Sequence, residues 1–170
     1  MDERSRIQEV LARYVRATDA RDGVAQGALF TDDAVVRIFS RTVDGAYAEV
    51  GEPLIGGAGV AFAVANFMAP HPPLGSSHHV TADHIIAVDG DTARLDAQYV
   101  VFGVQGTPRP DGGWPAGTVG MQGTVRPIES GYYDTELRLV DGAWKITRHH
   151  VLNDLPLALP DAGPAPSGRA

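Results

Sequence analysis

The chain has 170 residues, of which 44% are hydrophobic and 21% charged, and its formal net charge is −7. This length and composition are typical of a single globular domain with its own core. The acidic balance and the lack of a basic cluster argue against binding to nucleic acid or to an anionic membrane, because both need concentrated Lys and Arg. The chain has no cysteine, which excludes disulfides, thiolate metal ligands and a cysteine nucleophile.

The N-terminus is charged and leads directly into an amphipathic segment, so we expect no signal peptide. No apolar run reaches the about 18 residues that a membrane-spanning helix needs. These features favour a cytoplasmic protein that does not enter a membrane.

The N-terminal segment carries apolar residues at the spacing of one helix face, and Gly23 ends this pattern. A short second helix is expected over 25–30, strands over 34–40 and 47–50, and a third helix from Gly56 to Met68, which Pro70 stops. The residues of the first apolar stripe are Ile7, Val10, Leu11, Tyr14, Val15 and Thr18.

The second half of the chain is typical of an antiparallel sheet. Strands are expected over 77–88, 92–103, 119–125 with 132–140, and 143–152, with Asp-Gly turns at 89–90 and 141–142. The segment 103–127 is rich in Gly and Pro and is predicted to be a long hairpin loop. We expect one domain over 1–152, followed by a Pro/Ala-rich, mobile tail over 153–170.

Helices followed by long antiparallel strands predict an α+β fold. The natural solution is a curved antiparallel sheet wrapped around the N-terminal helices, which together make a cone-shaped α+β barrel with an apolar interior. Such a cone would offer a pocket for a small molecule.

Several segments, taken in order, resemble the SnoaL-like branch of the nuclear-transport-factor-2-like superfamily. They are Ile7–Ala34 with its Asp-Ala-Arg-Asp and Asp-Asp-Ala motifs, Gly56–Phe67, Ser77–Thr81, Asp89–Ala93 and Gly131–Ile146, so the resemblance covers roughly residues 5–151. It implies the cone-shaped fold. It also implies activities such as those of scytalone dehydratase, polyketide cyclases and ketosteroid isomerases, which need no metal and no cofactor.

Within this superfamily some members use an Asp–His dyad, and the resemblance places its carboxylate at Asp19 and its imidazole at His78. His78 would act as the general base, because imidazole titrates near neutral pH, and Asp19 would fix the ring tautomer. Alternation along the strand directs His79 to the opposite face. Asp19 has the simpler interpretation of a turn residue or an ion-pair partner of Arg21 or Arg148, and His78 that of an ordinary strand residue.

Tyr14 lies on the same helix stripe as Asp19 and is the best candidate for polarising a carbonyl group of the substrate. Other aromatic or polar side chains are candidates for binding the substrate, although each could equally be a core or wall residue. These candidates are Phe67, Tyr99, Trp114, Tyr133 and His150.

A metal site is an alternative use of the histidines. His78, His84, His149 and His150 could meet across strands, but no His-x-His or His-Glu-x-x-His spacing occurs, so no metal is predicted. The Gly-Gly-Ala-Gly run at 56–59 lacks the Lys-Ser/Thr of a phosphate-binding loop, so no nucleotide is predicted.

The sequence thus favours a cofactor-independent acid–base enzyme, of dehydratase, isomerase or cyclase type, acting on a small hydrophobic metabolite that contains a carbonyl. By the resemblance, a homodimer or homotrimer is expected. Two alternatives remain: a non-catalytic protein that binds a small molecule, and a structural subunit. A carrier would have a cavity without the Asp–His contact. A structural subunit would have a filled cone and an exposed apolar face.

Overall fold

The structure is a computed structural model, and it describes residues 2–158. Part of the tail predicted over 153–170 therefore lies outside the described residues. The chain folds in the order α1 (Glu3–Ala20), α2 (Gly23–Gly27), β1 (Phe30–Arg41), β2 (Tyr47–Glu49), β3 (Leu54–Ile55), α3 (Gly56–Phe67), β4 (Gly75–Asp89), β5 (Thr92–Gly106), β6 (Gly123–Val140) and β7 (Ala143–Asn153). Within residues 2–158 no helix has the length and apolar character needed to cross a membrane.

Helix α1 forms where the apolar stripe predicts it. The carboxylate of Asp2 caps its first turn by accepting a hydrogen bond from the backbone N–H of Ser5 at 2.8 Å. Arg21 ends the helix in a left-handed conformation, with φ of 57°, and its N–H bonds the carbonyls of the last turn. The end of α1 is therefore defined one residue after Ala20, and this fixes the position of Asp19.

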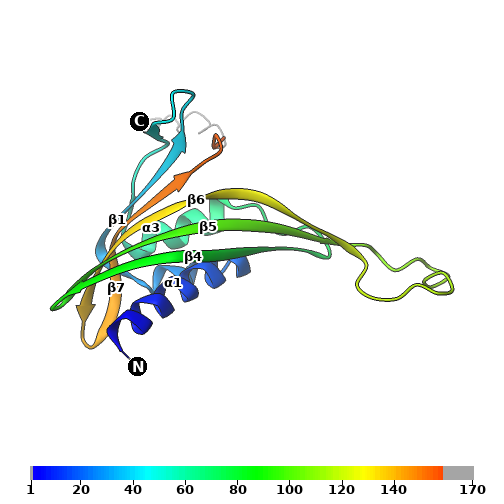
Figure 1. The fold of residues 1–170 in the computed structure, drawn as a ribbon, viewed down its shortest axis with the longest axis horizontal. Coiled ribbons are helices and arrows are strands. Elements are labelled where there is room, and N and C mark those ends of the chain that lie inside the picture. Colours follow the sequence, from blue (N-terminus) through cyan, green and yellow to red (C-terminus); the bar gives the residue numbers. More distant parts are fainter. Residues whose placement is uncertain (1, 159–170) are drawn as a thin grey trace, which may run out of the picture.

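The strands form one curved sheet in the order β2-β1-β7-β6-β5-β4, and β3 pairs with β1. All neighbouring pairs are antiparallel except β1 and β7, which are parallel. Figure 1 shows α1 packed along the sheet and the sheet curving around the helices. We call the side that faces α1 the inner face and the opposite side the outer face. The predicted α+β architecture, a curved sheet around N-terminal helices, is confirmed.

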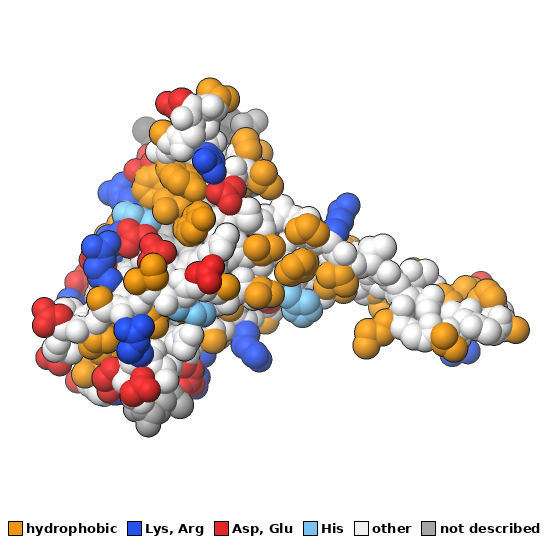
Figure 2. Space-filling model, viewed as in Figure 1, with side chains coloured by type: hydrophobic (Ala, Val, Ile, Leu, Met, Phe, Trp, Pro, Cys, Tyr) orange, Lys and Arg blue, Asp and Glu red, His pale blue; other side chains and the backbone are white. Residues whose placement is uncertain are grey.

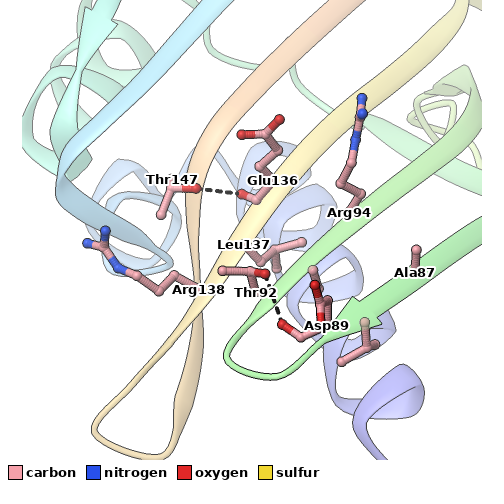
Figure 3. Close-up of a pocket in the computed structure, with 10 residues that line it drawn as sticks. Ala87, Asp89, Thr92, Arg94, Glu136, Leu137, Arg138 and Thr147 are labelled. Atoms are coloured by element: carbon pink, nitrogen blue, oxygen red, sulfur yellow. Dashed lines mark hydrogen bonds between the residues drawn. The ribbon is translucent and has the colours of Figure 1, made fainter.

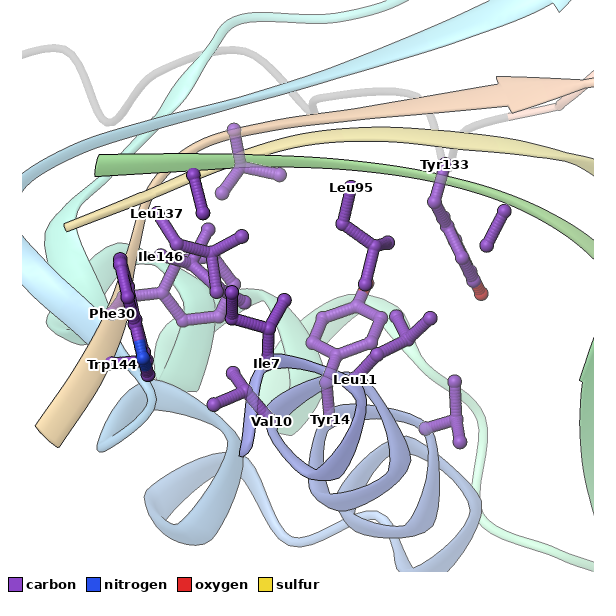
Figure 4. Close-up of a cluster of buried hydrophobic side chains, with 14 of the residues drawn as sticks. Ile7, Val10, Leu11, Tyr14, Phe30, Leu95, Tyr133, Leu137, Trp144 and Ile146 are labelled. Carbon is purple, nitrogen blue, oxygen red and sulfur yellow. The ribbon is translucent and has the colours of Figure 1, made fainter. Parts of the chain in front are cut away.

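The hydrophobic core lies between α1 and the inner face (Figure 4). Alternate residues of β5, from Ala93 to Val101, are buried there, while Arg94 and Asp96 between them are exposed. This alternation follows from the strand geometry, in which successive side chains point to opposite faces.

The hairpin of β5 and β6 is longer than the sequence predicted. Its strands reach Gly106 and start again at Gly123, where the prediction placed loop from 103 to 127, and the N–H of Thr107 bonds the carbonyl of Gln122 at 3.0 Å. We call residues 104–125 the arm. Figure 1 shows that it projects far beyond the rest of the molecule. The ladder continues to Gly106 and Gly123 because backbone pairing tolerates Gly, while residues 107–122 form the loop that the sequence predicted.

Two other predicted boundaries move. The second helix was expected over 25–30 but spans Gly23–Gly27, and Phe30 already belongs to β1. A Cβ atom placed on Gly57 would lie 2.2 Å from the carbonyl oxygen of Gly27. The glycines at the start of α3 thus permit its close packing on α2, which explains a run that is not a phosphate-binding loop.

Candidate active site

Asp19, in the last turn of α1, is the centre of a hydrogen-bonded cluster with β4. Its carboxylate accepts a bond from the Ser77 hydroxyl at 2.9 Å and another from the backbone N–H of His79 at 2.9 Å. Its Oδ1 lies 2.6 Å from Nδ1 of the His79 ring. The side chains of His79 and Asp19 are only 9% and 16% exposed. An Asp–His pair therefore exists, largely shielded from water.

The pair contains His79, so the prediction that Asp19 contacts His78 is wrong. His78 lies opposite Phe102 on the outer face and is exposed. His79 lies opposite Val101, which belongs to the buried alternation of β5, and so points to the inner face.

A β-bulge in β4 is the reason for this exchange of faces. The pairing with β5 shifts between Ala82 and Ile85, where three steps along β4 correspond to two along β5, and Asp83 has a φ of 52°. Ile86, beyond the bulge, is buried on the inner face. Regular alternation back from Ile86 would bring His78 inward, but the extra residue reverses the faces and brings His79 inward instead.

The geometry defines the roles available to the His79 ring. A carboxylate only accepts hydrogen bonds, so the contact with Asp19 places the ring proton on Nδ1 and leaves the lone pair on Nε2. Because β4 is an edge strand, the N–H of His79 is free to bond Asp19 instead of a neighbouring strand. Asp19 therefore both orients the imidazole and selects its tautomer.

The segment between α3 and β4 covers the end of α1 near this pair. Nε2 of His71 lies 2.8 Å from the backbone carbonyl of Asp19, and the Arg21 guanidinium donates to the carbonyl of Ala69. Burial lowers the pKa of Arg21, and the charge of Asp19 opposes that shift. These contacts hold the helix end against the strand that carries His79.

A row of aromatic rings leads from the pair into the core. The His79 ring lies 6.3 Å from that of Tyr99, which stacks on Tyr133 at 4.4 Å; Tyr133 meets Tyr14 edge-on at 5.7 Å, and Tyr14 lies 4.6 Å from His149. Burial raises the pKa of each tyrosine, so all three hydroxyls stay protonated at neutral pH.

His149 is the inner end of this row and is fully buried. Its Nδ1 lies 2.9 Å from the Thr135 hydroxyl, and its Nε2 has no partner among the described residues. Burial lowers the pKa of His149 to about 3, so the ring is neutral at physiological pH. A buried ring nitrogen without a partner is unusual, and it marks His149, together with Thr135, as a polar site inside a largely apolar core.

Two more polar groups belong to the inner face near the base of the arm. The Tyr99 hydroxyl donates to Oδ1 of Asn153 at 2.6 Å. Glu129 pairs with Val101, which itself pairs with His79, so His79, Val101 and Glu129 form one row across three strands. With about 4.8 Å between strands, the backbones of His79 and Glu129 are about 10 Å apart. This places a second carboxylate on the same face as the Asp–His pair.

Three of the predicted substrate-binding residues lie away from this face. Phe67 is more than half exposed at the end of α3, where it packs on Phe62, and Trp114 is on the arm. His150 is on the outer face, because its neighbour His149 points inward; its Nδ1 lies 2.9 Å from the guanidinium of Arg148. Alternation along β7 explains the position of His150.

Tyr14, Tyr99 and Tyr133 do lie inside the cone, but they fill it. All three are buried and pack on one another, so this region is a core and not the open apolar cavity that we expected. Hollows of about 470 Å³ and about 280 Å³ lie elsewhere on the surface, and neither of them is lined by Asp19 or His79. Figure 3 shows the larger one, among side chains that include Thr92, Arg94 and Glu136.

The histidines of the metal alternative do not meet. His78 and His150 are on the outer face, His149 is in the core, and His84 contacts Gln8 and Thr81. Within residues 2–158 no group of three or more His, Asp or Glu side chains is close enough to hold a metal ion.

The sequence did not identify His79, Ser77, Asn153 or Glu129 as site residues, and it considered His149 only as a possible metal ligand. Each of these side chains lies on the inner face of its strand. A correct prediction of which strand residues point toward α1 would therefore have made them candidates. For His79 the missing information was the bulge. For Glu129 a second bulge interferes, because the register between β5 and β6 shifts next to it.

The comparisons agree with this architecture. The family model of the SnoaL-like domain matches residues 1–150, so the chain belongs to the SnoaL-like family, whose members include cyclases and isomerases. The resemblance predicted from the sequence is thus confirmed. No curated protein matches the chain.

Solved structures with the same fold come from several bacteria. A protein assigned as the β subunit of an aromatic-ring-hydroxylating dioxygenase from Novosphingobium aromaticivorans is 22% identical over 91% of each chain, with a TM-score of 0.63. ActVI-ORFA from Streptomyces coelicolor is 15% identical over 88% of this chain and 96% of its own, with a TM-score of 0.64. A protein of unknown function from Mycobacterium tuberculosis is 24% identical over 89% and 72%, with a TM-score of 0.62. At these identities the similarity establishes the fold alone.

Proposed function

We propose that this protein is a cofactor-independent acid–base enzyme, of dehydratase, isomerase or cyclase type, whose substrate is a small hydrophobic molecule with a carbonyl group. The observation that carries the proposal is the contact between the Asp19 carboxylate and the His79 ring, which is supported by two further hydrogen bonds to the same carboxylate, from the Ser77 hydroxyl and the His79 N–H. This arrangement orients the His79 ring and leaves its Nε2 without a bond to Asp19. An ordinary surface ion pair does not require the ring to be held in this way.

The proposed chemistry starts with proton abstraction. Nε2 of His79 removes a proton from the carbon next to the carbonyl, and the electron pair of that C–H bond moves into the carbonyl to give an enolate. The imidazolium that forms is stabilised by the Asp19 carboxylate. The enolate then expels a β-hydroxyl, is reprotonated at another carbon, or attacks a second carbonyl, depending on the substrate.

One group on α1 and one on the inner face of the sheet are suited to stabilise the enolate and to move the second proton. A protonated tyrosine hydroxyl in a dry environment stabilises negative charge on an enolate oxygen, and Tyr14 is the candidate because Tyr99 already donates to Asn153. Glu129, in the row of His79 and Val101, is placed to exchange a proton with a leaving group or with a second carbon. Substrate entry then requires side chains of the packed aromatic row to move.

The test is proton exchange in D₂O with three probes: a β-diketone, a β-hydroxy ketone and a β,γ-unsaturated ketone. They report on C–H exchange, dehydration and double-bond migration, respectively, by NMR and mass spectrometry. We expect at least one probe to be turned over, and His79→Gln to reduce the rate by about 10²- to 10⁴-fold, the usual contribution of a positioned general base.

The neighbouring histidine supplies the matched control. His78→Gln changes the same residue type one position away, on the outer face, and we expect it to leave the rate unchanged. Equal losses in both variants, or an unchanged rate in His79→Gln, would contradict the role of the pair. No turnover of any probe by the unmodified protein would favour the second candidate.

The second candidate is a structural subunit, and two observations favour it. The cone is filled by aromatic side chains, and part of the outer face is apolar and exposed. The same fold also occurs in the protein assigned as a dioxygenase β subunit. In that role Asp19 and His79 would attach α1 to β4, the unmodified protein would turn over none of the probes, and His79→Gln would lower only the stability of the fold.

A further inference from the structure

The smaller hollow, of about 280 Å³, lies where the N-terminal half of α1 meets the turn between β6 and β7. Figure 1 shows this turn beside the N-terminal end of α1. Leu29, just before β1, completes the wall. Helix α1 contributes residues between positions 6 and 13 to this hollow, whereas Asp19 lies in the last turn of the helix. The hollow is therefore separate from the candidate active site.

Three cations line this hollow. Arg6 and Arg13 come from α1 and Lys145 from β7, so only the fold brings them together. Glu9 is the single carboxylate of the wall, and three positive charges with one negative charge leave a formal charge of +2. The whole chain, in contrast, has a net charge of −7. The hollow is a positive site in an acidic protein.

The larger hollow shows that this charge is not a general property of the surface. Its wall combines Arg94 and Arg138 with Asp89 and Glu136, so the charges cancel. Basic and acidic side chains are also intermixed over the body of the molecule on the face that Figure 2 shows. The smaller hollow differs from these regions in the sign of its charge, which favours a negatively charged ligand.

The two arginines are held in place by neighbouring groups. The Arg6 guanidinium pairs with Glu3 at 2.8 Å and donates to the carbonyl of Gly142. The Arg13 guanidinium pairs with Glu9 at 2.6 Å. A guanidinium has five N–H donors, so each arginine keeps donors for a ligand. Because the contacts already restrict both side chains, a ligand loses less free energy in ordering them.

Lys145 is the cation whose charge is least compensated. Its ammonium group donates to the backbone carbonyl of Ala28 and forms no ion pair with a carboxylate among the described residues. Two of its three N–H donors remain for a ligand. A hydrogen bond between an ammonium group and an anion is stronger than one between neutral groups. Lys145 is therefore the main contact that we expect for a bound anion.

The remainder of the wall is largely apolar. Val10 and Leu29 contribute aliphatic groups, and the indole of Trp144 is oriented by its N–H, which donates to Glu3. Inorganic phosphate would use none of this apolar surface. A small organic group that carries two negative charges would use both parts of the wall, as is typical of ligand sites with an apolar lining and a few placed charges.

We propose that this hollow binds a small organic dianion, either a phosphate monoester or a dicarboxylate, that carries one apolar group. The negative groups contact Lys145 and the two arginines, and the apolar group lies against Trp144. A bound ligand joins α1 to β7, so it stabilises the folded chain. The site takes no part in the proton transfer proposed for His79.

The test is a titration of the full-length chain with phenyl phosphate and with phthalate at low salt and a pH of about 8, where both are dianions. In a Trp114→Phe background Trp144 is the only tryptophan, so its fluorescence reports on this hollow. We expect a dissociation constant below about 1 mM for at least one of the two. Lys145→Met should raise it about tenfold, because it removes a hydrogen bond between charged groups.

Arg16 supplies the matched control, because it is an exposed cation of α1 that lies outside the hollow. Arg16→Met changes the net charge as Lys145→Met does, and we expect it to leave the dissociation constant unchanged. Lys145→Arg keeps the charge and should retain most of the affinity. Benzyl alcohol, which has the ring without the charges, should not bind. Circular dichroism checks that each variant is folded.

Three outcomes would overturn the proposal: a dissociation constant above about 1 mM for both dianions, binding of benzyl alcohol as tight as theirs, or equal weakening in Lys145→Met and Arg16→Met. Inorganic phosphate that binds as tightly as phenyl phosphate would overturn the role of the apolar wall. His79→Gln should leave the affinity unchanged, so this site is tested whether or not any carbonyl probe is turned over.

Discussion

Two pairs of adjacent histidines, 78–79 and 149–150, place the same residue type in opposite surroundings. In each pair one ring points inward and one outward. The two inner rings differ as well: His79 has a carboxylate at 2.6 Å, whereas His149 has only a hydroxyl at 2.9 Å and is completely buried. The Asp19 carboxylate orients the His79 ring at the edge of the core, whereas burial keeps the His149 ring neutral inside the core.

The largest expected effect concerns His149 in acid. Its pKa is about 3 in the folded chain and about 6.5 when unfolded, so between these pH values only the unfolded chain takes up the proton. His149 therefore lowers stability as pH falls from about 6.5 toward about 3. His149→Leu should remove this loss and gain on the order of 3 kcal/mol at pH of about 4 relative to pH of about 7.

Urea unfolding at several pH values measures this prediction, and His150→Leu is its control. The pKa of His150 is also lowered by burial, but the ring is only partly shielded, so its variant should show a much smaller change. Identical pH profiles for the two variants would mean that the inner and outer rings do not differ as described.

The next effect tests the partner charge of His79. Asp19→Ala removes the acceptor of three hydrogen bonds and leaves the Ser77 hydroxyl and the His79 N–H without their partner. We expect a loss of about 2 kcal/mol in the free energy of unfolding. Asp19→Asn keeps an acceptor oxygen and should lose less. Asp22 caps the first turn of α2, and removing such a cap costs about 1 kcal/mol. If Asp19→Ala lowers the free energy of unfolding by less than this, the cluster around Asp19 contributes little to stability.

The smallest expected effect on stability concerns the ion pairs of Arg148 on the outer face of the sheet. Arg148→Met breaks two ion pairs, with Asp134 and Glu136, in a partly exposed network. Because solvent and salt screen such pairs, we expect a change of about 1 kcal/mol or less, and one that shrinks at high salt. A larger, salt-independent loss in thermal unfolding would place this network among the main supports of the sheet.

The sequence was sufficient for most of the fold. The apolar spacing from Ile7 to Thr18 gave α1 almost to its last residue, and the alternation from Ala93 to Val101 gave the inner face of β5. It predicted the loop at the arm but misplaced its ends, because Gly and Pro between 103 and 127 indicated loop where β5 continues to Gly106 and β6 begins at Gly123. Local composition describes the preferences of single residues, whereas strand pairing depends on a neighbour elsewhere in the chain.

The candidate site shows even more clearly which features follow from the local sequence and which depend on the tertiary structure. The sequence by itself determined that a carboxylate ends the first helix and that two histidines stand near the start of β4. Only the tertiary structure decided which histidine meets Asp19, because one extra residue at Asp83–His84 exchanges the faces of the strand. It also decided that Tyr14, Tyr99 and Tyr133 pack together instead of lining an open cavity, since packing depends on distances between elements that no local pattern encodes.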